Sequence, residues 1–220
     1  MFITIEGIEG SGKTTQIKHI VAYLEGEGHA CVTTREPGGT AIGEKIRSIL
    51  LDAGNRDMDP AAELLLYTAD RAQHIKAFVN PALSSGKTVV CDRYFDATIA
   101  YQGFARGLDM DLINQLHQLI LGGLKPDVTL LLDLSPEIGL SRAWNQINNG
   151  TRSADETRFE EETLLFHEKV RAGYLAIARN EPGRYRIIDA AKSEEKVRNE
   201  IIEVLSVMPQ LVERSIETDK

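Results

Sequence analysis

The sequence predicts an α/β fold in which a five-stranded parallel sheet is the middle layer of a three-layer sandwich, with helices on both faces. Short apolar runs alternate along the chain with longer amphipathic stretches. Near-continuous apolar strands that alternate with helices are typical of a parallel sheet buried on both faces. The 220 residues fit a single domain, which we place at residues 1–208, followed by a C-terminal tail at 209–220.

The expected strands are short runs rich in Val, Ile, Leu or Thr. They lie at Phe2–Ile5, Cys31–Thr34, Thr88–Cys91, Val128–Leu134 and Tyr185–Ile188. Cap residues, prolines and glycines mark the expected helices, at about 13–25, 60–83, 109–121, 136–147 and 193–207, with a further helix that begins at Thr157. Thr157 and Glu160 have the spacing of a capping box. The polar stretch before them, about 148–158, has no periodicity and predicts a short mobile lid.

The charge balance limits the classes of partner. The chain has 25 basic and 33 acidic residues, a formal net charge of -8. Such an acidic surface disfavours nucleic acid and anionic membranes, although a local cationic pocket remains compatible with a small anion. No apolar run approaches the ~20 residues of a membrane span, and the first residues lack the pattern of a signal peptide. Two cysteines in apolar runs, Cys31 and Cys91, fit core positions, and we expect a cytoplasmic protein.

A phosphate-binding motif follows the first strand. The segment Gly7-Ile8-Glu9-Gly10-Ser11-Gly12-Lys13-Thr14 fits the pattern G-x-x-x-x-G-K-[ST], with Thr15 next in the helix. Its glycines let backbone N–H groups surround phosphate oxygens, and the helix adds its positive N-terminal end. Lys13 then reaches the β- and γ-phosphates, and the Thr14 hydroxyl binds Mg²⁺. The sequence therefore predicts a P-loop NTPase-type fold with a nucleoside triphosphate site.

Four further segments predict a pocket for a second, smaller substrate. Arg35 begins a REPGGT segment after the second strand, and Arg93 lies in the DRY segment after the third. Tyr67 and Arg71 are one turn apart on an expected helix, so they share a face. A YQG segment begins at Tyr101. Arginines pair with phosphate oxygens and an aromatic ring stacks on a base, which together suit a nucleoside monophosphate.

These segments, in this order, resemble the bacterial form of the thymidylate kinase (dTMP kinase) family, which are P-loop nucleoside monophosphate kinases. The resemblance runs from Phe2 to about Val204. It rests on GIEGSGKT at 7–14, REPGGT at 35–40, DRY at 92–94, AYQG at 100–103 and PDVTLLLD at 126–133, with GLSRA and TRFE on either side of the lid. It implies transfer of the γ-phosphoryl group of ATP to dTMP with Mg²⁺, in a homodimer.

The resemblance also implies roles for single residues. Arg35 and Arg93 would hold the 5′-phosphate of dTMP, and Tyr67 would stack on the base. The remaining contacts with the base and sugar would come from Arg71, Thr98, Tyr101 and Gln102, although a plain loop role fits Thr98 and Gln102 equally well. Glu9 would meet the 3′-hydroxyl or lie near Mg²⁺. Arg142 would help to form the adenine pocket.

Three assignments have alternatives. The catalytic cation of the lid is Arg152 or Arg158, with Arg142 at the base of the preceding helix. Mg²⁺ is ordered by Asp92, which we prefer, or by Asp133. Glu160 is either near the metal or only the capping partner of Thr157.

Two rival functions remain. The first is a kinase for another nucleotide or for a deoxynucleoside, and a nucleoside kinase would need a carboxylate base, for which Glu36 is available. The second is a P-loop switch or an ATP-dependent binding module, and a switch of the GTPase type would need an N-K-x-D segment, which the sequence lacks.

Overall fold

The five predicted strands form one sheet in the order β2-β3-β1-β4-β5, and every neighbouring pair is parallel. The computed structural model describes residues 1–151, 153 and 155–208. The three central strands, β1, β3 and β4, are buried along almost their whole length. The predicted α/β fold is therefore confirmed. The strands are β1 (Phe2–Glu6), β2 (Cys31–Arg35), β3 (Thr88–Asp92), β4 (Val128–Asp133) and β5 (Tyr185–Asp189).

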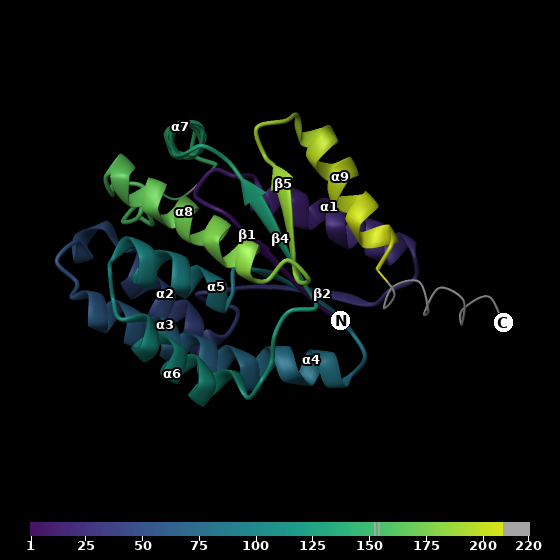
Figure 1. Cartoon of the computed structure of the whole chain (residues 1–220), viewed down its shortest axis with the longest axis horizontal. Helices are drawn as coiled ribbons and strands as arrows, with labels where there is room; N and C mark the ends of the chain where they lie inside the picture. The colour runs from purple at the N-terminus through teal and green to yellow at the C-terminus, as the bar shows by residue number, and fades with distance from the viewer. Residues whose placement is uncertain (152, 154, 209–220) are drawn as a thin grey trace.

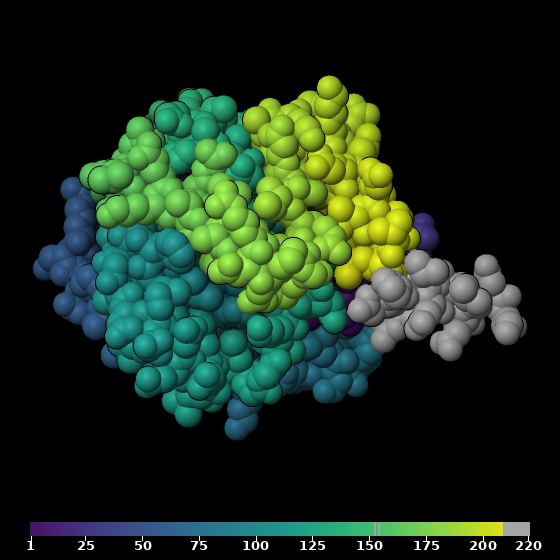
Figure 2. Space-filling model, viewed as in Figure 1, coloured from purple at the N-terminus to yellow at the C-terminus, as the bar shows by residue number. Residues whose placement is uncertain are grey.

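Helices cover both faces of this sheet (Figure 1). On one face, α1 (Lys13–Gly26) packs against α9 (Glu194–Ser206). On the other face, α8 (Leu164–Asn180) packs against β4 and β5, and also against α5 (Phe95–Thr98) and the π-helical segment η3 (Ile99–Ala105). Figure 2 shows α8 in light green and α9 in yellow at the surface of this view.

The remaining helices form an outer group on the α8 side. The helix α3 (Pro60–His74) continues into the π-helical segment η2 (Ile75–Val79) and α4 (Asn80–Ser84). Both α2 (Ala41–Leu51) and α6 (Met110–Leu121) pack against α3, and α7 (Pro136–Asn148) packs against α8. A single 3-10 turn, η1 (Ala53–Asn55), follows α2. Among the described residues, no helix has the length and apolar character that crossing a membrane requires.

Helix ends agree with the capping signals at several positions. The Asp59 carboxylate accepts from the Ala61 N–H at 2.8 Å, and that of Asp109 accepts from the Asp111 N–H at 2.7 Å. These bonds satisfy backbone donors that have no partner within the helix. At its other end, α6 stops at Gly122, whose φ of +55° suits a residue without a side chain.

The predicted helix start at Thr157 is wrong. The helix α8 begins at Leu164, and its cap is Thr163, whose hydroxyl accepts from the Phe166 N–H at 3.2 Å. Thr157 instead donates its hydroxyl to the Glu161 side chain at 3.2 Å. Both threonines precede acidic and apolar residues, and each is followed by a buried phenylalanine, Phe159 or Phe166, so the local pattern alone does not decide between them.

The structure also differs from the expected elements in three other places. The predicted helix over 60–83 is interrupted, because residues Ile75–Val79 are π-helical. The helix α2 was not predicted at all, although Thr40 caps it by accepting from the Gly43 N–H at 2.9 Å. The region after β3 is also helical, so Thr98 and Gln102 lie on α5 and η3 and not in a loop.

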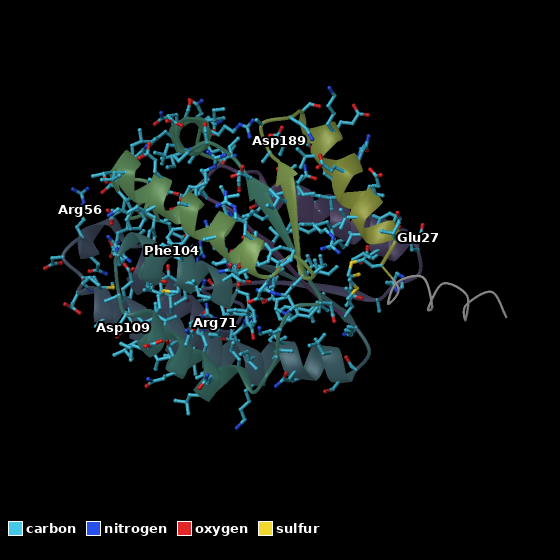
Figure 3. The ribbon with its side chains drawn as sticks, in the orientation of Figure 1. Glu27, Arg56, Arg71, Phe104, Asp109 and Asp189 are labelled. Carbon is cyan, nitrogen blue, oxygen red and sulfur yellow. The ribbon has the colours of Figure 1, made fainter. Side chains whose placement is uncertain are left out.

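The carboxyl edge of the sheet gathers polar side chains. Register pairs Asp92 with Ile5 on β1 and with Arg35 on β2. Asp133 and Asp189 are paired on the other side of the sheet, and Asp189 marks this edge in Figure 3. Ligands of open parallel sheets bind beyond this edge, so a binding site is expected there.

Candidate active site

A cavity of about 250 Å³ opens beyond the carboxyl edge. Segments far apart in the sequence contribute to its wall: the loop after β1, the segment after β2, α3, the end of β3, η3 and the segment before α8. Most of the residues singled out from the sequence meet here. The wall includes Glu9 through Thr15, Arg35, Tyr67, Arg71, Asp92, Arg93, Thr98, Tyr101, Gln102 and Glu160.

The phosphate loop forms one end of this cavity. Gly10 has a φ of +68°, and a Cβ there would clash with the carbonyl oxygen of Gly139 on α7. No other residue fits so close to a neighbouring backbone. Gly7 and Ile8 lie outside the cavity wall, but their carbonyl oxygens each accept from Lys13 Nζ at 3.1 Å. The loop is thus closed around its own lysine.

Lys13 is in an unusual electrostatic environment. Burial and the nearby Arg93 charge lower its pKa to about 8. Ser11 Oγ is buried there without a hydrogen-bond partner within the described structure, and the first turn of α1 contains no acidic residue. A phosphate group would relieve both conditions, because it brings negative charge and acceptor oxygens to the positive end of a helix.

Arg93 also lies in the cavity wall, beside the phosphate loop. Its φ of +69° makes it the one non-glycine residue in the left-handed region among those described. One guanidinium nitrogen donates to Tyr174 Oη at 3.0 Å, the other donates to Glu9 Oε1 at 3.0 Å, and the guanidinium carbon lies 4.9 Å from the Tyr101 ring centre. Burial opposes the charge, but Tyr101, Tyr174 and Glu9 raise the pKa of Arg93, which stays cationic. A fixed cation facing the cavity suits an anion.

Glu9 is the acidic member of the phosphate loop and is only 7% exposed. Its Oε1 accepts from Tyr101 Oη at 2.6 Å as well as from Arg93, and His167 Nδ1 lies 3.2 Å from its Oε2. Burial alone would raise the pKa of Glu9, but His167, Arg93 and Lys13 outweigh it and hold the pKa below its usual range. Glu9 is therefore an ionised carboxylate at the cavity wall.

Arg71, labelled in Figure 3, is fully buried on α3 and still reaches the cavity. It donates to Glu36 Oε2 at 2.7 Å, to Thr98 Oγ1 at 2.9 Å and to the Tyr94 carbonyl at 3.1 Å. His74 Nδ1 lies 2.8 Å from the other Glu36 oxygen. Since both oxygens of Glu36 are engaged, that carboxylate is poorly suited to act as the free base that a nucleoside kinase would need.

The remaining predicted substrate residues differ in their exposure and in the hydrogen bonds that hold them. Arg35 donates to Glu44 at 2.9 Å, and its side chain is 47% exposed. Gln102 is buried and donates its amide to Glu63 Oε1 at 2.8 Å. Tyr67 lies in the cavity wall, and burial, with the charge of Glu63, raises its pKa, so its ring carries a neutral hydroxyl.

Comparison with known proteins decides the family. The family model described as thymidylate kinase matches residues 5–201. The chain is 56% identical to the thymidylate kinase of Desulfosudis oleivorans over 96% of this chain and 99% of that one. It is 52% identical to the thymidylate kinase of Geobacter sulfurreducens over 93% and 95% of the two chains. A crystal structure of thymidylate kinase from Ehrlichia chaffeensis superimposes with a TM-score of 0.72 at 36% identity, covering 94% of this chain and 98% of that chain.

The chain belongs to the thymidylate kinase family. It is a kinase, and thus a transferase of nucleotide biosynthesis. The resemblance drawn from its motifs is confirmed.

The arginines predicted for the lid of this thymidylate kinase are placed differently. Arg152 lies outside the described residues. Arg158 is 4% exposed and outside the cavity wall, and it donates to the Leu50 carbonyl and to Glu63. Arg142 is also outside the wall and donates to the Ala190 carbonyl at 3.0 Å, in the segment after β5. The structure therefore does not bring Arg158 or Arg142 to the cavity.

Three of the four candidate metal residues lie in the cavity wall, and the fourth lies outside it. Asp92, Thr14 and Glu160 all lie in the cavity wall, and the buried Asp92 Oδ1 has no hydrogen-bond partner within the described structure. Asp133 is outside the wall and holds Arg171 through two bonds of 2.7 and 2.8 Å. Within residues 1–151, 153 and 155–208, no three His, Cys, Asp or Glu residues form a ready metal cluster. The wall fits Mg²⁺, which keeps waters and takes phosphate oxygens alongside few protein ligands.

Sequence reasoning missed four residues of this site. Arg47 on α2 lies in the cavity wall and pairs with Glu156 at 2.7 Å, but α2 was not predicted. Tyr174 and His167 come from α8, where they read as ordinary apolar-face positions. Glu6 is a charged residue at the end of the apolar strand β1, and a charged residue in that position is a sequence signal for a site at the carboxyl edge.

Glu6 gives the site a pH-dependent stability. Burial and the Asp96 charge raise its pKa to about 8, and it accepts from the Tyr94 N–H and the Tyr174 hydroxyl, each at 2.7 Å. Below its ordinary pKa of 4.5 the carboxyl is protonated in both folded and unfolded chains. As the pH rises from 4.5 towards about 8, only the unfolded chain releases the proton, so stability from this group falls.

We therefore expect Glu6→Gln to reduce the loss of thermal stability between pH 4.5 and about 8, because glutamine stays neutral throughout. Melting temperatures at both ends of this range measure the effect. Glu27→Gln is the matched control, since Glu27 is exposed (Figure 3). An unchanged slope in the Glu6 variant would contradict the prediction.

Proposed function

We propose that the chain transfers the γ-phosphoryl group of ATP to dTMP, giving dTDP and ADP for dTTP synthesis. The observation that carries this proposal is one cavity whose wall combines the phosphate loop with a second set of cationic and aromatic side chains. Lys13 comes from the loop, and Arg93, Arg71 and Tyr67 come from the end of β3 and from α3. Two anionic substrates would bind in this cavity with their phosphates next to each other.

The P-loop would bind the triphosphate of the donor, ATP. Residues Gly10 to Thr15 supply backbone N–H groups to the triphosphate, and Lys13 neutralises its terminal charge. Gly7, Ile8 and Glu9 complete the loop, and Arg142 would shape the adenine pocket beside Ala190. When bound by Thr14, Asp92 and Glu160, Mg²⁺ would supply charge neutralisation at the phosphates.

The side chains that bind the acceptor would recognise dTMP by its charge and shape. Arg93 and Arg35 would hold the 5′-phosphate, and Tyr67 would stack on the pyrimidine. Arg71 retains N–H groups beyond its bonds to Glu36, Thr98 and the Tyr94 carbonyl, because a guanidinium has five. It would donate to a carbonyl of the base.

The sugar would lie near the other wall residues. Glu9 would accept from the 3′-hydroxyl, and Tyr101 would crowd the 2′ position and disfavour ribose. Thr98 and Gln102 would complete the edges of the base and sugar. Each lies in the cavity wall.

The reaction itself requires little covalent chemistry from the protein. An oxygen of the dTMP phosphate attacks the γ-phosphorus, the bond to the β-bridging oxygen breaks, and ADP leaves with that electron pair. The attacking oxygen is already anionic, so no strong base is needed. Positioning and charge neutralisation by Lys13 and Arg93 therefore account for the chemistry. Of the two candidates in the lid, Arg158 is held by Leu50 and Glu63 outside the cavity wall, so Arg152 is the lid cation that would add to this neutralisation.

The test is the initial rate of ADP release at fixed MgATP with dTMP, dUMP, dCMP or thymidine as acceptor. We expect dTMP to be preferred over dUMP only modestly, since one methyl group in an apolar pocket is worth about 1–3 kcal/mol. We expect dCMP to be poor, because Arg71 would donate to a carbonyl that cytosine replaces with an amine. Thymidine phosphorylation would favour a nucleoside kinase, and equal rates with dCMP and dTMP would contradict the role of Arg71.

We also propose a homodimer in the cytoplasm. Large apolar side chains are exposed on two neighbouring helices, Leu65 on α3 (57%) and Leu112 and Leu119 on α6 (44% and 79%). Covering them with a second copy would remove this surface from water. Light scattering after size exclusion should give twice the chain mass of 24.4 kDa. A mass of 24.4 kDa at all concentrations would contradict the dimer. The cytoplasmic location is inferred from the nucleotide substrates.

A further inference from the structure

A tyrosine that lies outside the cavity wall holds Arg93. Tyr174 comes from α8 and is only 1% exposed. Its Oη accepts from Arg93 Nη1 at 3.0 Å and donates to Glu6 Oε2 at 2.7 Å. Tyr174 therefore touches the arginine without reaching any molecule in the cavity.

The close packing of α8 against η3 fixes where this hydroxyl lies. A Cβ on the preceding residue, Gly173, would lie 2.9 Å from the Phe104 ring and 3.1 Å from the Cα of Ala100, both on η3. Only glycine allows two backbones to approach so closely. The Tyr174 ring also lies edge-on to the Tyr101 ring, with ring centres 6.3 Å apart. Packing thus sets the position of the tyrosine independently of its hydrogen bonds.

Arg93 keeps donors free for a ligand. A guanidinium has five N–H groups, and the hydrogen bonds to Tyr174 and Glu9 use one each. The Arg93 side chain lies in the cavity wall and is 17% exposed. Its other N–H groups are therefore available to an oxygen atom in the cavity.

Tyr174 holds the guanidinium without neutralising it. Burial and the charge of Glu6 raise the pKa of the Tyr174 hydroxyl, so the hydroxyl stays neutral. The other partner of Arg93, Glu9, is an ionised carboxylate and offsets part of the positive charge. A neutral acceptor fixes the direction of the N–H groups and leaves the charge to act on a phosphate.

We propose that Tyr174 is a positioning residue, whose hydroxyl holds the Arg93 guanidinium in the orientation that binds the 5′-phosphate of the acceptor nucleotide. This inference rests on the proposed function. Without the hydroxyl, Nη1 would lose its partner, and the guanidinium would be free to turn about its single bond to Glu9. The contacts with the phosphate would then weaken, because their donors are no longer fixed.

The experiment measures the dissociation constants of dTMP and of thymidine by titration calorimetry, with the full chain and no donor nucleotide. The ratio of the two constants reports what the 5′-phosphate contributes to binding. We expect Tyr174→Phe to lower this ratio by about tenfold, the scale of one hydrogen bond to a charged group. The Kd of thymidine should not change, whereas a merely structural defect would weaken both ligands alike.

Two comparisons test whether the effect acts through Arg93. Tyr185→Phe is the matched control, since Tyr185 is also a buried tyrosine but lies on β5, outside the cavity wall, and its ratio should not change. In the Arg93→Ala background, Tyr174→Phe should lower the ratio no further, because no guanidinium is left to hold. An unchanged ratio in Tyr174→Phe, or the same decrease with and without Arg93, would overturn the inference.

A second background decides the matter if Tyr174→Phe does not fold, since that variant leaves the buried Glu6 Oε2 without its donor. Glu6→Gln removes the charge there and keeps the tyrosine hydroxyl. We expect Glu6→Gln to keep most of the ratio, and Glu6→Gln with Tyr174→Phe to lose about tenfold. Equal ratios in these two variants would also overturn the inference, and they would leave dTMP phosphorylation by the unmodified chain intact. Failure of the unmodified chain to phosphorylate dTMP would instead refute the proposed function.

Discussion

Arg93→Ala is expected to lower kcat/KM for dTMP by at least ~100-fold, in the range seen when a charge partner of a transition state is removed. The guanidinium is held by Tyr174 and Glu9, with its charge facing the cavity. Its loss removes the proposed partner of the 5′-phosphate and leaves the Glu9 carboxylate less compensated. Both effects act against an anionic acceptor. Initial rates at saturating MgATP, with dTMP varied, measure the change.

The backbone strain at position 93 is the same in the alanine variant, so it does not contribute to the expected loss of activity. Arg93 already has a φ of +69°, and alanine meets the same steric cost there as arginine. Arg198→Ala is the control, since it removes an arginine from the exposed face of α9, beyond the cavity. Near-normal turnover in Arg93→Ala would remove this residue from the proposed mechanism.

Lys13→Ala is expected to have an effect of similar size, at least ~100-fold on kcat/KM, for a different reason. Lys13 Nζ is within 3.1 Å of two carbonyl oxygens of the phosphate loop, so it both closes the loop and supplies its charge. The alanine variant would lose positive charge where negative charge develops on the transferred group. The rate should therefore fall even when MgATP saturates the enzyme, and kcat should fall together with kcat/KM.

The control lies on the same helix. Lys18→Ala removes the same charge from an exposed position of α1, so it reports any general effect of net charge. The Lys13 assignment fails if the two variants retain comparable kcat values.

The phosphate loop and the strands were predictable because they depend on local sequence. A run such as Phe2–Glu6 has only one way to be buried on both faces, and the glycines at 7, 10 and 12 permit a turn that side chains would block. Lys13 follows from the spacing alone. Arg93 required the additional knowledge that residues after neighbouring parallel strands meet at one edge, and register places Asp92 beside Ile5 and Arg35.

The second half of the site was not predictable in the same way. Arg47 and His167 are brought to Glu156 and Glu9 by contacts across 109 and 158 residues of chain, and no local pattern marks them. Thr157 shows the opposite problem, since a local capping pattern was present and tertiary packing used Thr163 in its place. Helix propensity and capping are weak signals wherever packing has a choice of neighbours.

The approach of Gly10 to Gly139 has a mechanical consequence. These two backbones touch without intervening side chains, so no rotamer is available to absorb a displacement between them. A tilt of α7 is then transmitted directly to the curvature of the phosphate loop. The shape of the loop that would bind the triphosphate therefore depends on Gly139, a helix residue that lies outside the cavity wall.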